Sequence, residues 1–132
     1  MRLLLDSHYC LWLTLRRDRL RPAEFGVLVD PDNELAFASA SIWELQIKWE
    51  RRFVSGERKG EASPLQILRG LRSVNIACVD LTAEIAASEL RSPIQHGDPF
   101  DALLLTIAQE TGLKLFTRDE KLRGHPLAYH AE

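Results

Sequence analysis

The sequence predicts a three-layer α/β protein, in which a central parallel sheet of four to five strands carries helices on both faces. Short apolar runs alternate along the chain with segments of helical periodicity, as in successive βαβ units. The first run, residues 2–5, is apolar at every position after Arg2, as expected for a central strand buried on both faces. The chain has 132 residues, of which 45% are hydrophobic, so we expect residues 1–132 to form one domain with its own core.

The first half of the chain is predicted to contain two strands and three helices. Asp6 ends the first strand, and Ser7 is a suitable N-cap for a helix that continues to Leu15. A short second helix follows Pro22, and residues 35–38 form the second strand. The next helix runs from about residue 42 to 53, and residues 54–62 form a polar loop too short to separate two domains.

The second half repeats the alternation. Ser63 and Pro64 begin a helix, residues 76–81 form the third strand, and Thr82 caps a helix that reaches residue 90. After a connector, Asp98 begins the helix with the clearest apolar stripe in the chain, which ends at Gly112. The fourth strand (113–116), a short helix from 117 stopped by a glycine at 124, and an edge strand (127–129) complete the chain.

The composition excludes some classes of protein. The formal net charge of −2 and the pI of about 6.1 provide no global basic field for nucleic acid, although a groove can still be locally basic. Cys10 and Cys78 lie in apolar runs without metal-ligand spacing, so we expect buried thiols in a reducing compartment. There is no signal-peptide pattern and no apolar run near the roughly 18–20 residues of a membrane span, which predicts a cytoplasmic protein without a membrane partner.

Five acidic residues are predicted to meet at one edge of the sheet. Helices of right-handed βαβ units run antiparallel to the strands, so strand ends and the starts of the following helices share the carboxyl edge. Asp6 and Asp119 follow strands, and Glu44 is expected in the first turn of the helix after the second strand. Asp98 and Asp101 flank the start of the helix before the fourth strand. Open α/β sheets bind their ligands at this edge.

Each acid also has a purely structural interpretation. Ser41 with Glu44, and Thr117 with Glu120, have the spacing of capping boxes, and Glu44 is one turn from Lys48. Asp98, Asp101 and Asp119 suit the N-terminal ends of helices. Asp6 fits this interpretation least, because a charge at the end of an apolar strand is costly to bury and no basic residue is near it in sequence.

A shared pocket would require a cation. Two carboxylates about 5 Å apart repel by roughly 3 kcal/mol at an effective dielectric of 20. Three in mutual contact would cost on the order of 10 kcal/mol, which is comparable to the stability of a whole domain. All the ligands are oxygens, so the pattern favours Mg²⁺, with Mn²⁺ as a substitute, over zinc. Such an ion suits phosphodiester hydrolysis by an activated water.

Four segments together resemble the PIN-domain nucleases, and most closely the VapC-type toxins of bacterial toxin–antitoxin pairs. The segments lie in the order of that family and span nearly the whole chain; they are residues 4–13, 40–48, 96–109 and 117–122. The resemblance implies a PIN-like fold, an acidic Mg²⁺ pocket and an RNA substrate. One departure is Ala102, where the family usually has an arginine.

The resemblance also implies roles for individual residues. Asp6, Glu44 and Asp101 are the core catalytic and metal-binding acids, Asp119 is the fourth, and Asp98 either binds metal or only shapes the start of its helix. The residues expected to contact RNA are Ser7, His8, Lys48 and Arg118, and Arg51 and Arg52 are further basic candidates for holding the phosphate backbone. The family further implies a homodimer and a cognate antitoxin lying across the acidic groove. Two alternatives remain open: a receiver-like signalling domain with Asp6 as phosphoacceptor, and a non-catalytic binding module.

Overall fold

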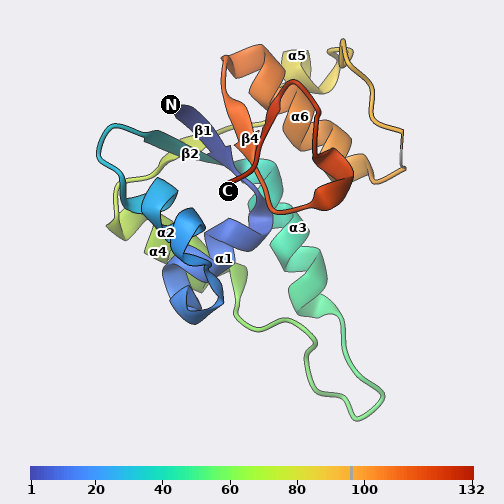
Figure 1. The fold of residues 1–132 in the computed structure, drawn as a ribbon. Helices are drawn as coiled ribbons and strands as arrows, with labels where there is room; N and C mark the ends of the chain where they lie inside the picture. The colour runs from blue at the N-terminus through green and yellow to red at the C-terminus, as the bar shows by residue number, and fades with distance from the viewer. Residues whose placement is uncertain (96) are drawn as a thin grey trace.

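A parallel sheet forms the centre of the computed structural model, which describes residues 1–95 and 97–132 (Figure 1). The described strands follow the order β3-β2-β1-β4-β5, and every pairing between them is parallel. Their bounds are β1 Arg2–Leu5, β2 Glu34–Ala38, β3 Ala77–Val79, β4 Lys114–Phe116 and β5 Ala128–Tyr129. The predicted α/β class, with four to five parallel strands, is confirmed.

Helices cover both faces of this sheet, as predicted. Figure 1 shows α1, α2 and α4 on one side of the sheet and α5 and α6 on the other, while α3 continues from the carboxyl edge. The described helices are α1 Ser7–Leu15, α2 Pro22–Val29, α3 Ser39–Glu50, α4 Pro64–Ser73, α5 Ala83–Ala86 and α6 Pro99–Thr111, with 3₁₀ turns η1 Arg17–Arg19 and η2 Glu120–Leu122. Within the described part of the chain, no helix is long and apolar enough to cross a membrane.

The sheet separates two apolar cores, and its central strand β1 contributes side chains to both. Leu3 and Leu5 pack with side chains of α1, α2, α3 and α4, whereas Leu4 points to the opposite face and packs against α6. All three side chains are fully buried, which follows from the alternation of successive side chains along a strand. The uninterrupted leucine run is therefore explained by burial on both faces.

The chain reverses its direction of travel across the sheet at β1. After β1 it passes through β2 to β3 on one side, and later returns to β4 and β5 on the other. Asp6 lies just beyond β1, where its N–H donates to the Phe116 carbonyl oxygen (3.0 Å) and so extends the pairing with β4. A crevice outside the carboxyl ends of the strands at such a switch point is the usual ligand site of an open α/β sheet.

Several predicted boundaries were wrong. Asp6, not Ser7, is the N-cap of α1, and its side chain accepts a hydrogen bond from the Ser7 N–H. The helix α3 begins at residue 39 because it follows β2 without a loop, and it ends at residue 50 because Arg51 is extended. The third strand and the following helix are shorter than predicted, with bounds at 77–79 and 83–86.

The two cysteines differ in their surroundings. Cys10 lies on the inner face of α1 and is buried in the core, as predicted. Cys78 is exposed, so the prediction of a second buried thiol was wrong. The reason is its position on β3, which is an edge strand of the described sheet and is only partly covered.

Candidate active site

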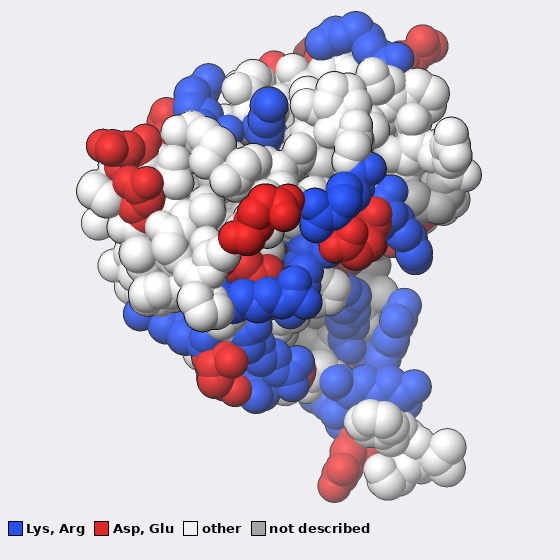
Figure 2. Space-filling view, in the orientation of Figure 1, with Lys and Arg blue, Asp and Glu red and all other residues white. Residues whose placement is uncertain are grey.

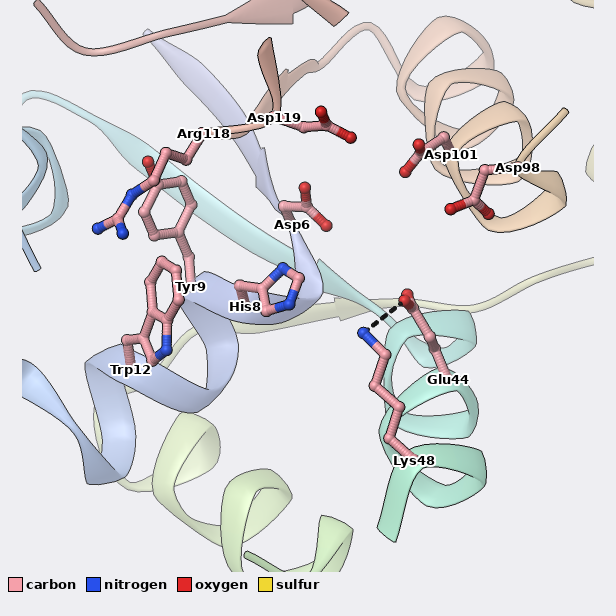
Figure 3. Close-up of a pocket in the computed structure, with 10 residues that line it drawn as sticks. All are labelled: Asp6, His8, Tyr9, Trp12, Glu44, Lys48, Asp98, Asp101, Arg118 and Asp119. Carbon is pink, nitrogen blue, oxygen red and sulfur yellow. Dashed lines mark ion pairs between the residues drawn. The ribbon is translucent and has the colours of Figure 1, made fainter. Parts of the chain in front are cut away.

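A cavity of about 310 Å³ lies at the carboxyl edge of the sheet, and all five predicted acids line it. They come from segments far apart in sequence, and in Figure 3 their carboxylates face a common space. The other lining residues are His8, Tyr9, Trp12, Lys48 and Arg118. Figure 2 shows acidic side chains near the middle of this face with lysine and arginine around them. The topology therefore brings the acids together as predicted.

Asp6 is held at the floor of the cavity by two hydrogen bonds. Its Oδ1 accepts from the Ser7 N–H at 2.7 Å, and its Oδ2 accepts from the Thr117 hydroxyl at 2.6 Å. The residue is only 9% exposed, and this burial raises the pKa of its carboxyl although both hydrogen bonds favour the ionised form. Asp6 is thus a fixed acid in a site where its negative charge is disfavoured.

Glu44 approaches the cavity from α3, in the second helical turn and not in the first as predicted. One carboxylate oxygen accepts from the Ser7 hydroxyl at 2.6 Å, and the other pairs with Lys48 Nζ at 3.1 Å. The predicted capping box with Ser41 is absent, and the buried Ser41 hydroxyl has no hydrogen-bond partner among the described residues. Ser7 therefore holds Glu44 from within the protein, and Lys48 is engaged with the same carboxylate.

The first turn of α6 supplies two more acids. Asp98 is the N-cap, and its side chain accepts from the Phe100 N–H at 2.9 Å. Asp101 lies in the first turn, and Figure 3 shows its carboxylate facing Asp6 and Asp119. Burial, and after it the negative charges of Asp98, Asp6, Asp119 and Glu44 in that order, together raise the pKa of Asp101 to about 7. Burial and repulsion between the acids thus both disfavour the negative charge of Asp101.

Asp119 enters the cavity just beyond β4. Its side chain caps η2 by accepting from the Lys121 N–H at 3.0 Å, so the predicted capping box of Thr117 with Glu120 does not form. The Thr117 hydroxyl instead accepts from the Asp119 N–H at 3.0 Å while donating to Asp6. Thr117 thus links two acids of the cavity, whereas its spacing from Glu120 in the sequence suggests only a capping role.

Arg118 forms the cationic side of the cavity. Its guanidinium binds Glu24 with two nitrogens, at 2.8 and 2.5 Å, and lies 4.2 Å from the centre of the Trp12 ring. The Tyr9 hydroxyl also donates to Glu24, at 2.6 Å. Burial of Glu24 opposes its charge, but the bonds from Arg118, Tyr9 and the Arg21 N–H lower its pKa to about 2. Glu24 was not predicted, because its partners are distant in sequence.

Of the three histidines that the structure describes, His8 alone lines the cavity. His8 lines it and stacks on Trp12 with ring centroids 5.4 Å apart. The rings of His125 and His130 bond backbone carbonyls of Ser92 and Asp119. His96, the first residue of the third motif, lies outside the described residues.

The donor set suits a hard divalent cation. Every acid that lines the cavity offers carboxylate oxygens, which Mg²⁺ and Mn²⁺ prefer. As the described side chains stand, no three histidine, cysteine or acidic groups are placed to hold one ion together. The chemistry of the donors therefore fits the ion.

The fold and the cavity define a class of protein: a parallel α/β domain with an acidic cavity at its switch point. A family model described as PIN domain matches residues 3–126 of the chain. The chain is 33% identical over 123 residues to ribonuclease VapC22 of Mycobacterium tuberculosis, a match that covers 92% of this chain and 90% of the relative. The chain belongs to the PIN-domain family. The predicted membership of the PIN-domain nucleases, close to the VapC-type toxins, is confirmed.

Two solved structures share the fold. One is VapBC2 from Rickettsia felis bound to a DNA fragment from their promoter, with a TM-score of 0.66, 17% identity and complete coverage of both chains. The other is a toxin–antitoxin complex from Klebsiella pneumoniae, with a TM-score of 0.62 and 19% identity over 96% of this chain and 95% of that one. At these identities the similarity concerns the architecture of the sheet and its helices.

Proposed function

We propose that residues 1–132 form one metal-dependent endoribonuclease domain, which acts as the toxin of a toxin–antitoxin pair. The observation that carries the proposal is the convergence of five carboxylates from four separate segments in one cavity, where burial and the other four charges raise the pKa of Asp101. The similarity to a ribonuclease over most of both chains supports RNA as the substrate. The likeness in fold to toxin–antitoxin assemblies supports an antitoxin partner.

The metal site is proposed to lie among the five acids that line the cavity. Asp6, Glu44, Asp101 and Asp119 would hold Mg²⁺ or Mn²⁺, with Asp98 next to them. Bound there, the ion would supply an activated water and offset the charge that develops on the phosphate. The chain's own contribution is orientation, since Thr117 and the Ser7 N–H fix both oxygens of Asp6, and the Ser7 hydroxyl fixes Glu44.

The substrate contacts are proposed from the cavity rim. His8, Lys48 and Arg118 line the cavity and place positive or hydrogen-bonding groups beside the acids. Ser7 is fully buried and acts through Glu44, so its proposed role is orientation within the site and not direct contact with RNA. We also propose that the toxin forms a homodimer and acts in the cytoplasm, where it would encounter RNA and its antitoxin.

The decisive experiment compares acid variants of the purified protein. With Mg²⁺ present, Asp6→Asn and Asp101→Asn are each expected to slow RNA cleavage at least about 100-fold, because each removes a proposed ligand. Asp32→Asn is the matched control, because Asp32 is exposed in the turn before β2, at the other edge of the sheet. This variant should cleave RNA like the wild type. Full activity of a folded Asp6→Asn protein would refute the proposal.

The order of the strands disfavours the receiver-like alternative. Receiver domains have the order 2-1-3-4-5, whereas β1 here lies between β2 and β4. Incubation with a small phosphodonor tests this alternative directly, because a phosphorylated Asp6 would increase the intact mass of the protein. A non-catalytic module would show no thermal stabilisation by Mg²⁺.

A further inference from the structure

The segment between α3 and α4 folds as a small hairpin that projects from the body of the protein. Figure 1 shows this loop leaving the end of α3 and extending away from the sheet and helices. Arg52 pairs with Arg58 in an antiparallel bridge, the Phe53 N–H donates to the Glu57 carbonyl oxygen at 2.8 Å, and the Lys59 N–H donates to the Arg51 carbonyl oxygen at 2.8 Å. The sequence predicts a polar loop over residues 54–62, with Arg51 and Arg52 as candidate phosphate contacts, but it does not predict the hairpin.

The turn and the base of the hairpin are both specified by glycine. At the tip, Gly56 has φ +91° and donates to the Phe53 carbonyl oxygen at 2.9 Å, as in a turn that ends in a left-handed residue. At the base, a Cβ on Gly60 would lie 2.7 Å from the Trp49 Cα, so the returning strand passes directly against α3. Arg58 closes the base by lying 4.6 Å from the centre of the Trp49 ring. The hairpin therefore has a defined turn at its tip and is held against α3 at its base.

The hairpin concentrates positive charge in an acidic protein. Residues 51–59 are all exposed and carry four cations against the single carboxylate of Glu57, whereas the whole chain has a net charge of −2. None of the four cations forms an ion pair with a carboxylate in the described part of the chain. In Figure 2 lysine and arginine cover the base of this projection. The cations are Arg51, Arg52, Arg58 and Lys59.

The charged surface is continuous with the acidic cavity. A second cavity of about 280 Å³ is lined by Lys59 and also by His8, Trp12 and Lys48, three residues that line the first cavity as well. Glu44 is separated from Phe53 by six helical residues at about 1.5 Å each and three extended residues at about 3.3 Å each, so the two lie at most about 20 Å apart along this path. An RNA backbone that reaches from the cavity to the hairpin therefore extends several nucleotides beyond the cleaved bond.

We infer that the hairpin 51–59 is a second RNA-binding surface, which holds the phosphate backbone several nucleotides to one side of the bond that the acidic cavity cleaves. The inference rests on the proposed ribonuclease function and adds a substrate class: RNA that extends beyond the cavity on this side. Backbone contacts of this kind come from arginine and lysine side chains whose charge is not neutralised by a carboxylate, and they do not require a particular base. Phe53, which is exposed at the tip, adds an aromatic face on which a base can stack.

The test compares two double variants of the full-length protein with the same change in charge. Arg51→Gln/Lys59→Gln removes two hairpin cations whose backbone groups, and not their side chains, form the hairpin bond. Arg72→Gln/Lys114→Gln is the control, because both residues are exposed at the end of α4 and the start of β4, toward the opposite edge of the sheet. The affinity for a labelled mixed-sequence RNA of about 30 nucleotides is measured by fluorescence anisotropy over a range of salt, without divalent cation.

The hairpin variant should bind this RNA about tenfold more weakly at roughly 0.15 M salt, with a salt slope smaller by about 1.4, since each single-strand phosphate contact contributes about 0.7. With Mg²⁺ its KM should rise by a similar factor while kcat stays unchanged, and the control should match the wild type in every measurement. An unchanged affinity of the hairpin variant would overturn the inference and would be the result if the hairpin served a protein partner. An equal loss in the control would also overturn it. The proposed function fails in a different way: a wild-type protein that binds RNA but does not cleave it with Mg²⁺ would refute the ribonuclease function, whatever the binding results for the hairpin.

Discussion

The ion pair between the buried Glu24 and the half-buried Arg118 gives the sharpest prediction about stability. The Glu24 side chain is only 4% exposed and accepts hydrogen bonds from Arg118, Tyr9 and the Arg21 N–H. In Glu24→Gln the side chain keeps its shape but loses its charge, which leaves the Arg118 guanidinium without its partner. Removal of one partner of a buried pair typically costs about 3–5 kcal/mol.

The pKa of Glu24 gives an independent magnitude. Folding lowers the pKa of Glu24 from its ordinary 4.5 to about 2, which corresponds to about 3 kcal/mol of stability near neutral pH. Because the pKa is depressed in the folded protein, this stability is fully present above about pH 4.5 and is lost as the pH falls toward 2. The destabilisation of Glu24→Gln should therefore be about 3 kcal/mol at pH 7 and should shrink at acidic pH.

Urea unfolding followed by circular dichroism at pH 7 and at about pH 3 measures both effects. Glu120→Gln is the matched control, because Glu120 pairs with Arg123 at the surface with 69% of its side chain exposed. Its free energy of unfolding should equal that of the wild type within error. A loss below about 1 kcal/mol for Glu24→Gln, or a loss of the same size at both pH values, would refute the electrostatic explanation.

Three further predictions concern the acidic cavity and the turns. Because the pKa of Asp101 is raised to about 7 in the folded protein, the stability of the metal-free protein should fall as the pH rises from about 4 to 7. Thermal unfolding should show the largest stabilisation by Mg²⁺ above this range, and Asp101→Asn should make the stability less dependent on pH between about 4 and 7. Thr117→Val removes the donor to Asp6 and should cost about 1–3 kcal/mol in urea unfolding, a figure that an unchanged midpoint would contradict. Gly60→Ala should lower the melting temperature because its Cβ would meet backbone at 2.7 Å, whereas Gly26→Ala, with open space in α2, should stabilise by about 0.5–1 kcal/mol.

The convergence of the acids was predictable because it depends only on where strands end. Asp6 and Asp119 follow β1 and β4, and parallel pairing of these strands places both residues at one edge whatever the details of packing. Glu44 reached the cavity although the start of its helix was misplaced by three residues, because the whole first part of α3 leaves the same edge. A prediction of which residues share an edge of the sheet can therefore be right even when the predicted ends of the helices are wrong by a few residues.

The supporting side chains were not predictable in the same way. Thr117 bonds Asp6 across 111 residues, and Arg118 bonds Glu24 across 94, so both contacts depend on strand register and on the docking of α2. Local spacing suggested a capping role for Thr117, and nothing in the sequence around Glu24 distinguished it from a surface acid. The hairpin was missed because its bonds are between backbone groups and its order depends on a close contact of Gly60 with Trp49.

The central position of β1 has a consequence for synthesis of the protein. Although β1 is made first, one of its edges is paired only when β4, at residues 114–116, joins it, and the Thr117 hydroxyl reaches Asp6 at the same point. A chain synthesised only as far as residue 112 therefore has an open strand edge and no Asp119 beside the other acids. The acidic cavity is complete only after the segment with β4, Thr117 and Asp119 has been made and has paired with β1.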